Sequence, residues 1–283
     1  MSAQTGLVET YRGGVSPWEC DVMNHFNIAF YVGRLADAAS DLMERYAPER
    51  SWRTLVVHTS YEQELRAGDG IAIRSGIIAV GGDTLRLGHE ATNSATGART
   101  TIAEHVLSPA EPEGWSELRD TLAAASVAWQ APAFGPIELP AGPGPIPSGR
   151  DRVKPWEANT AGQLSLTGIL HRCSAACLHV LDAIGMTDAY RRRTQRGFST
   201  FESRLAVESP ANVGEGVVVE SAVLHAGTSS LRMLHRLHES RSRRPLAHFY
   251  QAGAHFDIEL RRSAPLPPEI KEKLLALQSA GSG

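Results

Sequence analysis

The feature that most constrains the fold of this chain is an internal duplication. The segment VSPWECDVMNHFNIAFY begins at Val15 and aligns with VKPWEANTAGQLSLTGI, which begins at Val153. Both segments open with V-x-P-W-E and continue into an apolar run. One offset of 138 residues relates Val15 to Val153 (153 − 15) and Glu19 to Glu157 (157 − 19). Ordered similarity at a fixed offset is typical of two copies of one structural unit.

Further matches follow in the same order along the chain. GDG at 68–70 aligns with GEG at 214–216, and DTLRLGHE aligns with SSLRMLHR. Each half then closes with a Pro-rich step before an amphipathic helix. We therefore predict an N-terminal domain over residues 1–130, a Pro/Gly-rich linker over 131–149 and a C-terminal domain over 150–283.

Within each copy, the residue pattern predicts a short strand, a long helix and then four antiparallel strands. Apolar residues recur at helical spacing from Ile28 to Tyr46 and from Leu166 to Ile184. In the first copy, runs rich in β-branched residues follow at 51–65, 70–80, 83–93 and 98–107, with turn-forming GGD and NSATG between them. We expect hairpin-linked strands and an α+β fold, in which the sheet covers the apolar stripe of the helix.

Composition narrows the class of protein. The chain has 28 basic and 31 acidic side chains, so there is no basic excess of the kind that binds nucleic acid. We identify no secretory leader and no apolar stretch of membrane-spanning length, and we expect a cytoplasmic protein without membrane contact. Cys20, Cys173 and Cys177 are too few and badly spaced for a zinc site or a disulfide framework. Nothing in the sequence favours Cys20 as a nucleophile over its acidic neighbour.

A dense set of polar side chains lies around the start of the first predicted helix. The set comprises Asp21, Asn24, His25, Asn27 and Tyr31. The second copy has Asn159, Gly162, Gln163, Ser165 and Ile169 at these positions. Asp and Asn are favoured helix caps, and for Asn27 alone we expect a capping role. A helix needs only one cap, and the second copy makes its helix without the set. We therefore interpret the set as a reaction centre that the second copy has lost.

The stretch D-x-x-N-H-F-N-I-A-F-Y, from Asp21 to Tyr31, resembles the D-x-x-G-H-x-N-N-x-x-Y signature of hot-dog acyl-CoA thioesterases of the 4-hydroxybenzoyl-CoA thioesterase type. Asn24 stands where that family has Gly, and Ile28 stands where it has a second Asn. An Asn can adopt the left-handed conformation that a Gly supplies, so the turn can be kept. The resemblance implies a double hot-dog, in which two tandem copies of a helix wrapped by an antiparallel sheet form a pseudo-dimer.

The resemblance also implies the chemistry. It implies a thioester hydrolase that converts an acyl-CoA to the free acid and coenzyme A. Asp21 would act as nucleophile or general base, and backbone N–H groups at the helix start would face the thioester carbonyl. The implied catalytic residues are Asp21, His25 and Asn27, and the expected substrate-binding residues are Asn24, Tyr31, His58, Glu62, Glu202 and Arg204.

We expect the partner to be a small-molecule acyl-CoA, with coenzyme A as part of the substrate, no other cofactor and no metal. The pseudo-dimeric chain could assemble further into a homo-oligomer. We predict that His58, Glu62 and Glu64 alternate on one strand, and that Glu202 and Arg204 occupy the matching strand of the second copy. The basic run at 191–196 could meet the phosphates of coenzyme A or could be a solvated loop.

Two other functions stay open at this stage. A hot-dog hydratase or dehydratase would pair an acid with a His across an acyl thioester, but no Gly-Asp-x-Asn-Pro-x-His run occurs. A non-catalytic acyl-CoA-binding protein could keep the fold without the chemistry. Retention of the whole polar set in the first copy favours the thioesterase.

Overall fold

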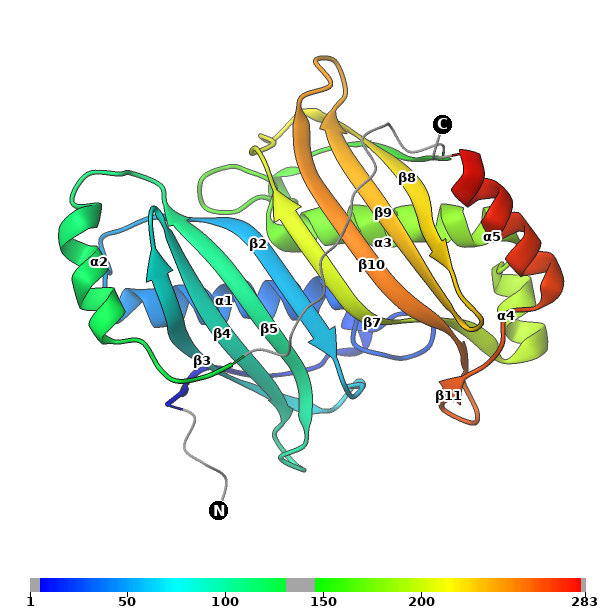
Figure 1. Ribbon diagram of the computed structural model, residues 1–283, viewed down its shortest axis with the longest axis horizontal. Helices are drawn as coiled ribbons and strands as arrows, with labels where there is room; N and C mark the ends of the chain where they lie inside the picture. Colours follow the sequence, from blue (N-terminus) through cyan, green and yellow to red (C-terminus); the bar gives the residue numbers. More distant parts are fainter. Residues whose placement is uncertain (1–5, 131–145, 281–283) are drawn as a thin grey trace. The chain divides into compact units, whose positions relative to one another are not determined.

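The computed structural model describes residues 6–130 and 146–280. The chain divides into two compact units, Met1–Gly135 (unit 1) and Pro136–Gly283 (unit 2), each built around a long helix (Figure 1). The predicted linker at 131–149 lies outside the described residues over 131–145, and its last four residues belong to a strand of unit 2.

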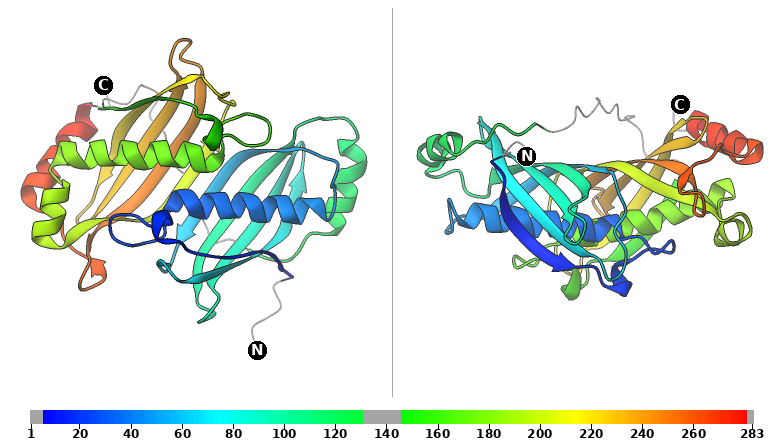
Figure 2. Two further views of the ribbon diagram at one scale, coloured as in Figure 1. Left: turned by 180° about the vertical axis from the view of Figure 1, so that it is seen from behind. Right: turned by 90° about the horizontal axis from the view of Figure 1, so that it is seen from below.

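Unit 1 has an antiparallel sheet with one long helix across a face (Figures 1 and 2). Its described elements are β1 (Val8–Gly14), the 3-10 turn η1 (Pro17–Glu19), α1 (Ile28–Glu44), β2 (Trp52–Tyr61), β3 (Gly70–Gly81), β4 (Thr84–Asn93), β5 (Arg99–Pro109) and α2 (Trp115–Ala124). Within this unit the strand order is β1-β3-β4-β5-β2. The helix and the strands thus adopt the α+β arrangement expected from the sequence.

Unit 2 repeats this arrangement. Its described elements are β6 (Ile146–Arg152), the 3-10 turn η2 (Pro155–Glu157), α3 (Leu166–Ile184), α4 (Asp188–Thr194), β7 (Arg196–Val207), β8 (Gly216–Ala226), β9 (Ser230–Glu239), β10 (Pro245–Asp257), β11 (Arg262–Ser263) and α5 (Pro268–Ala280). Its strand order is β6-β8-β9-β10-β7, with β11 paired to β10. The short helix α4 is an addition that the described part of unit 1 lacks between its long helix and the next strand.

The predicted succession of hairpins is correct for β3, β4 and β5. It is wrong for β2, the first of the four strands predicted after the helix. Tight turns join β3 to β4 and β4 to β5, and Gly82 takes a φ of 58° in the first of them. However, β2 pairs with β5 at the far side of the sheet and not with β3. The connection at 62–69 is not a hairpin turn, and it passes the start of α1, where the Leu65 carbonyl accepts the Phe26 N–H at 2.7 Å.

The core of each unit lies between its long helix and its sheet. The apolar stripe of α1 contributes Val32, Leu35, Ala39, Leu42 and Met43, all buried. The residues that pack around the last three of these include Ile77, Leu85, Leu87 and Leu107 from the strands and Leu122 from α2. Tyr46, predicted to extend the stripe, lies beyond the end of α1 and is exposed. No helix in the described part of the chain is long and apolar enough to span a membrane.

Candidate active site

The loop before α1 is organised by the carboxylate of Asp21. Its Oδ1 accepts the backbone N–H groups of Met23 at 2.8 Å and His25 at 3.0 Å. The Asp21 N–H donates to the His25 carbonyl, and the Asn24 N–H donates to the Asp21 carbonyl. Asn24 has a φ of 60°, which is the left-handed conformation predicted for it. Within the described residues, Oδ2 of Asp21 has no hydrogen-bond partner.

Unit 2 builds the same loop with an amide in place of the acid. Oδ1 of Asn159 accepts the N–H groups of Ala161 and Gln163, both at 3.0 Å. The backbone pairs are also repeated, from Asn159 N–H to the Gln163 carbonyl and from Gly162 N–H to the Asn159 carbonyl. Gly162 has a φ of 72° where unit 1 has Asn24. The loop therefore needs a side-chain oxygen at this position and does not need a charge.

Asn27 is the N-cap of α1, as its residue type predicts. Its Oδ1 accepts the Ala29 N–H at 2.9 Å, and its own N–H donates to the Glu19 carbonyl. Ser165 caps α3 in the same way by accepting the Gly168 N–H. Because the side-chain oxygen of Asn27 accepts this N–H, the residue fixes where the helix begins.

His25 is buried beside an acidic side chain. Its Nε2 lies 3.1 Å from Oε2 of Glu64, and Nη2 of Arg66 lies 3.8 Å from the same carboxylate oxygen. The prediction that Glu62 and Glu64 lie on a strand is wrong, because β2 ends at Tyr61. The period-two pattern continues in the sequence after the chain has left the sheet. Glu64 instead reaches the loop because the 62–69 connection passes the start of α1.

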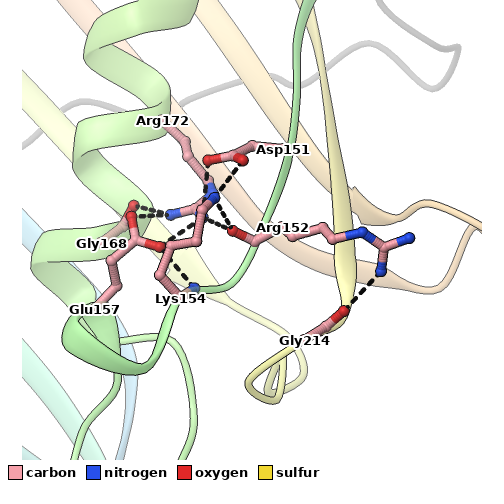
Figure 3. A network of polar contacts seen from close by, with 7 residues as sticks. All are labelled: Asp151, Arg152, Lys154, Glu157, Gly168, Arg172 and Gly214. Atoms are coloured by element: carbon pink, nitrogen blue, oxygen red, sulfur yellow. Dashed lines mark hydrogen bonds and ion pairs between the residues drawn. The ribbon is translucent and has the colours of Figure 1, made fainter.

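A buried ion pair anchors the 3-10 turn to the long helix in each unit. In unit 1, Glu19 is buried, its Oε1 lies 2.6 Å from Nη2 of Arg34, and its Oε2 accepts the Ser16 N–H. In unit 2, Arg172 donates from both terminal nitrogens to Glu157, at 3.0 and 2.9 Å (Figure 3). The offset of 138 residues relates both members of the pair (157 − 19 and 172 − 34).

The unit 2 pair has additional partners. Arg172 also donates to the carbonyls of Gly168 and Arg152, and its Nη2 lies 3.4 Å from Asp151 (Figure 3). Burial alone would raise the pKa of Glu157, but hydrogen bonds from Arg172 and from the Lys154 N–H hold it below its ordinary value. This network therefore fixes the turn before α3. The loop after this turn carries Asn159, where unit 1 has the acid Asp21.

Tyr31 points into the interior of unit 1. Its ring contacts Phe26 at 4.5 Å and Tyr61 at 5.4 Å between centroids, and 4% of the residue is exposed. Burial raises the pKa of Tyr31 well above its ordinary value, and the nearby Thr101 and Thr100 hydroxyls oppose this only in part. The phenol is therefore neutral and can donate or accept a hydrogen bond.

The other residues predicted for the site lie on β2, just after its end, or in unit 2. His58 is buried on β2, but its neighbours Val57 and Thr59 share the sheet face of Tyr61, so His58 faces away from α1. Glu62 forms a two-point ion pair with Arg99 at 2.8 and 3.0 Å on the surface. Glu202 and Arg204 lie on β7 of unit 2.

The basic run lies on α4 and at the start of β7. Asp188 pairs with Arg191 and Arg192, and Asp257 lies 3.6 Å from Arg196. Arg193 lies over the Tyr190 ring.

The cysteines do not have the environment of nucleophiles. Burial raises the pKa of Cys20, and the neighbouring acids raise it further despite a backbone hydrogen bond. Burial also raises the pKa of Cys177 to about 12 and that of Cys173 still higher. Among the residues that the structure describes, no three His, Cys, Asp or Glu side chains are grouped as ligands of a metal ion. The acid at the helix start is thus the candidate reactive group.

Each unit wraps a long helix in an antiparallel sheet, and unit 1 holds an acid at the helix start. This combination defines the class of hot-dog thioester hydrolases. The model of the thioesterase-like superfamily matches residues 15–110 and 153–274, and the chain belongs to that family. The predicted double hot-dog fold and thioester hydrolase class are thereby confirmed.

Solved structures agree on the fold. The chain is similar to an acyl-ACP thioesterase from Bacteroides thetaiotaomicron, with 10% identity, a TM-score of 0.61 and coverage of 89% of this chain and 100% of that one. It is also similar to the 12:0-ACP thioesterase from Umbellularia californica, with 10% identity, a TM-score of 0.59 and coverage of 88% of this chain and 94% of that one. Among curated proteins, none matches the sequence.

Sequence reasoning missed two features of unit 1. It gave no role to Arg34, which pairs with the buried Glu19. The signal was available, because the second copy keeps both residues at the same offset. It also missed the buried hydroxyl groups of Thr59 and Thr101, which become neighbours of Tyr31 and Tyr61 only through the pairing of β2 with β5.

Proposed function

We propose that this protein is an acyl-CoA thioesterase whose reaction depends on the carboxylate of Asp21. The observation that carries the proposal is the correspondence between Asp21 and Asn159, whose side-chain oxygens accept equivalent pairs of backbone N–H groups. An amide oxygen is sufficient for that structural task. The negative charge of Asp21 is therefore available for chemistry, and a carboxylate can serve as nucleophile or general base where an amide cannot.

The start of α1 supports this assignment by offering a donor for the oxyanion. From Met23 to Tyr31, every backbone N–H except that of Ile28 donates to a described residue. The Ile28 N–H is the first of the helix, where the helix dipole adds partial positive charge. A thioester carbonyl directed at this N–H would have its developing negative charge stabilised beside the Asp21 loop.

The reaction can take two forms with the same groups. As a general base, Asp21 accepts a proton from water while the water oxygen bonds to the thioester carbon. The C–S bond then breaks, and the sulfur leaves and takes up a proton as free coenzyme A. As a nucleophile, Oδ2 bonds to the carbon and expels the sulfur, and water then opens the mixed anhydride. In either form His25, held beside Glu64, orients the substrate at the loop.

The proposal includes coenzyme A as the acyl carrier and the substrate contacts that were predicted from the sequence. The resemblance of the Asp21 loop to acyl-CoA thioesterases favours coenzyme A, whereas the two solved structures described above are named as acyl-ACP enzymes. Asn24, His58, Glu62, Glu202 and Arg204 stay predicted substrate contacts. One acyl group presented on coenzyme A and on acyl carrier protein would separate the two carriers through the ratio of their kcat/KM values.

The direct test is Asp21→Asn. We expect kcat/KM for thiol release from acyl-CoA to fall by about 10²- to 10⁴-fold, the usual contribution of such a group. The melting temperature should stay unchanged, because Asn can accept the same N–H groups, as Asn159 does. Full turnover in the variant would overturn the assignment. Enoyl absorbance in the same reactions would reveal a hydratase, and ¹⁸O transfer from labelled Asp21 to the product acid would identify direct attack.

A further inference from the structure

Two rows of side chains cross the unit 1 sheet on the face that α1 covers. In the first row, Thr59 of β2 is paired with Ala103 of β5, which is paired with His89 of β4. In the second row, Tyr61 is paired with Thr101. Thr59 and Tyr61 are two residues apart, so they share a face, and Tyr61 meets Tyr31 of α1 on that face.

Among the described residues, three hydroxyl groups in this region are buried and make no hydrogen bond of regular geometry, although the Thr101 hydroxyl lies close enough to the Tyr31 phenol to affect its pKa. They are Oγ1 of Thr59, Oγ1 of Thr101 and the phenol oxygen of Tyr31. Both threonines are 0% exposed and Tyr31 is 4% exposed. A buried polar group without a partner is destabilising, and native structures keep few of them. Three at one place therefore point to a role in binding.

Neighbouring hydroxyls show that the fold can satisfy such groups when they are structural. Next to His89 in the first row, Ser75 bonds to Nδ1 of His89 at 2.7 Å and to Thr10 at 2.6 Å. Unit 2 repeats this chain, with Ser221 bonded to Ser148 at 2.5 Å and to His235 at 2.7 Å. The bonded part of the polar row is thus common to both units.

The unpaired part of the row is not repeated. Phe249 pairs with His235 and with Leu205, as Ala103 pairs with His89 and with Thr59. Ala247 occupies the position of Thr101, and Ile169 occupies the position of Tyr31. All three hydroxyls are replaced by apolar side chains, and the methyl group of Ala103 is replaced by a fully buried benzyl group. The hot-dog unit therefore folds without these hydroxyls.

We propose that Tyr31, Thr59 and Thr101 form a subsite in unit 1 that binds a neutral hydroxyl or oxo group carried by the acyl chain. This inference rests on the proposed function and names the class of acyl group. Tyr31 lies one helical turn after Asn27, and its helix begins at the loop of Asp21. A hydroxyl or oxo group would give the three oxygens the partners they lack. A carboxylate would have to be desolvated with no cation supplied by these three residues, so it is disfavoured.

The test uses matched pairs of acyl-CoA thioesters that differ by one hydroxyl. The pairs are β-hydroxyhexanoyl and hexanoyl, ω-hydroxyhexanoyl and hexanoyl, and para-hydroxyphenylpropanoyl and phenylpropanoyl. The variants are Thr59→Val, Thr101→Val and Tyr31→Phe, each of which removes one hydroxyl with little change of shape. The control is Ser108→Ala, because Ser108 is also on β5, is buried and has an unpaired Oγ. It lies seven residues from Thr101, about 24 Å along the strand.

We expect the wild type to prefer the hydroxylated member of at least one pair by kcat/KM. Each subsite variant should reduce that preference by about tenfold, as for one lost hydrogen bond. Ser108→Ala should leave the ratio unchanged. Melting temperatures should rise or stay equal in the threonine variants and in the control, because each loses an unpaired buried hydroxyl.

Three results would overturn the inference. They are no preference in any pair, a preference that all three variants keep, or a threonine variant that melts well below the wild type, since that would show the hydroxyl to be structural. Failure of the proposed function has a different signature, which is no thiol release from any thioester. In that case the intact thioesters serve as ligands, and the rise of the melting temperature on binding is measured. A larger rise with the hydroxylated member in the wild type than in Thr101→Val supports the inference. Equal rises reject it.

Discussion

Unit 1 and unit 2 hold the loop before their long helix with the same hydrogen bonds but with different side chains. Asp21 and Asn159 each accept two backbone N–H groups, and Asn24 and Gly162 each take a left-handed φ. The geometry of the loop is therefore a property of the fold. The carboxylate is a property of unit 1 alone, and this difference separates the chemistry from the structure.

The same division extends into the interior. The pairs Glu19–Arg34 and Glu157–Arg172 are present in both units, and so are the bonded Ser–His pairs beneath the long helices. The unpaired hydroxyls of unit 1 have apolar counterparts in unit 2. A duplicated chain thus contains its own control, because a residue that the fold requires should be present twice.

The largest expected effect on stability comes from breaking the ion pair in one unit at a time. Arg34→Met leaves the side chain of Glu19, which is 5% exposed, without its cation. We expect a loss of about 3 kcal/mol, at the lower end of the range for a buried pair, because Arg34 itself is partly exposed. The free energy of unfolding in urea measures it.

Arg172→Met is the matched variant in unit 2. It leaves Glu157 more exposed, at 19% of its side chain, whereas the backbone N–H that still donates to the acid (from Ser16 in unit 1 and from Lys154 in unit 2) is common to both units. Its cost should therefore be smaller than that of Arg34→Met. Equal costs, or a larger cost in unit 2, would show that burial of the remaining acid does not decide the penalty.

The next largest effect is a loss of stability at acidic pH. Burial lowers the pKa of His105 to about 4, whereas an unfolded histidine titrates near 6.5. Between these values the unfolded chain binds a proton that the native chain does not. Stability is therefore lost as the pH falls through this window, by at most about 1.4 kcal/mol per pH unit for one histidine. The equivalent residue of unit 2 is Gln251, whose amide bonds to Thr200 as His105 bonds to Thr54.

His105→Gln should keep the fold and reduce the loss of stability between pH about 7 and about 5. Urea midpoints at the two pH values measure the change. Gln251→His is the reverse control and should increase the loss. An unchanged pH dependence in both variants would mean that these interior positions do not titrate on unfolding.

The smallest effect is expected at the turn. Asn24→Gly places in unit 1 the residue that unit 2 has. We expect the free energy of unfolding to change by no more than about 1 kcal/mol, with a correspondingly small shift of the melting temperature. Asn24→Val should be clearly worse, because a β-branched residue is strained at a φ of 60°. Equal melting temperatures for the two variants would show that the left-handed conformation is not retained.

The sequence predicts the repeated parts of this protein well because duplication gives two observations of each element. The long helices, the capping role of Asn27 and the left-handed Asn24 follow from local patterns. The pairing of β2 with β5 does not, because the choice of sheet edge depends on tertiary packing. The contact of His25 with Glu64 follows from that pairing, and the sequence pattern wrongly continued the strand through Glu64.

The unpaired hydroxyls were missed for a related reason. Thr59 and Thr101 are 42 residues apart in the chain (101 − 59) and lie in adjacent rows of the same sheet face only once the register is known. Each residue alone is an ordinary strand threonine. Comparison with Leu205 and Ala247 would have drawn attention to them, but only with the two copies aligned along every strand.

The central claim is that hydrolysis in unit 1 requires the negative charge of Asp21, whereas the structure of the loop requires only a side-chain oxygen at that position. The exchange variant Asp21→Asn with Asn159→Asp tests it most directly, because composition and net charge stay the same and each loop keeps its acceptor. The account predicts a wild-type melting temperature and a loss of kcat/KM for acyl-CoA hydrolysis as large as that of Asp21→Asn alone. Wild-type turnover in the exchange variant would contradict it.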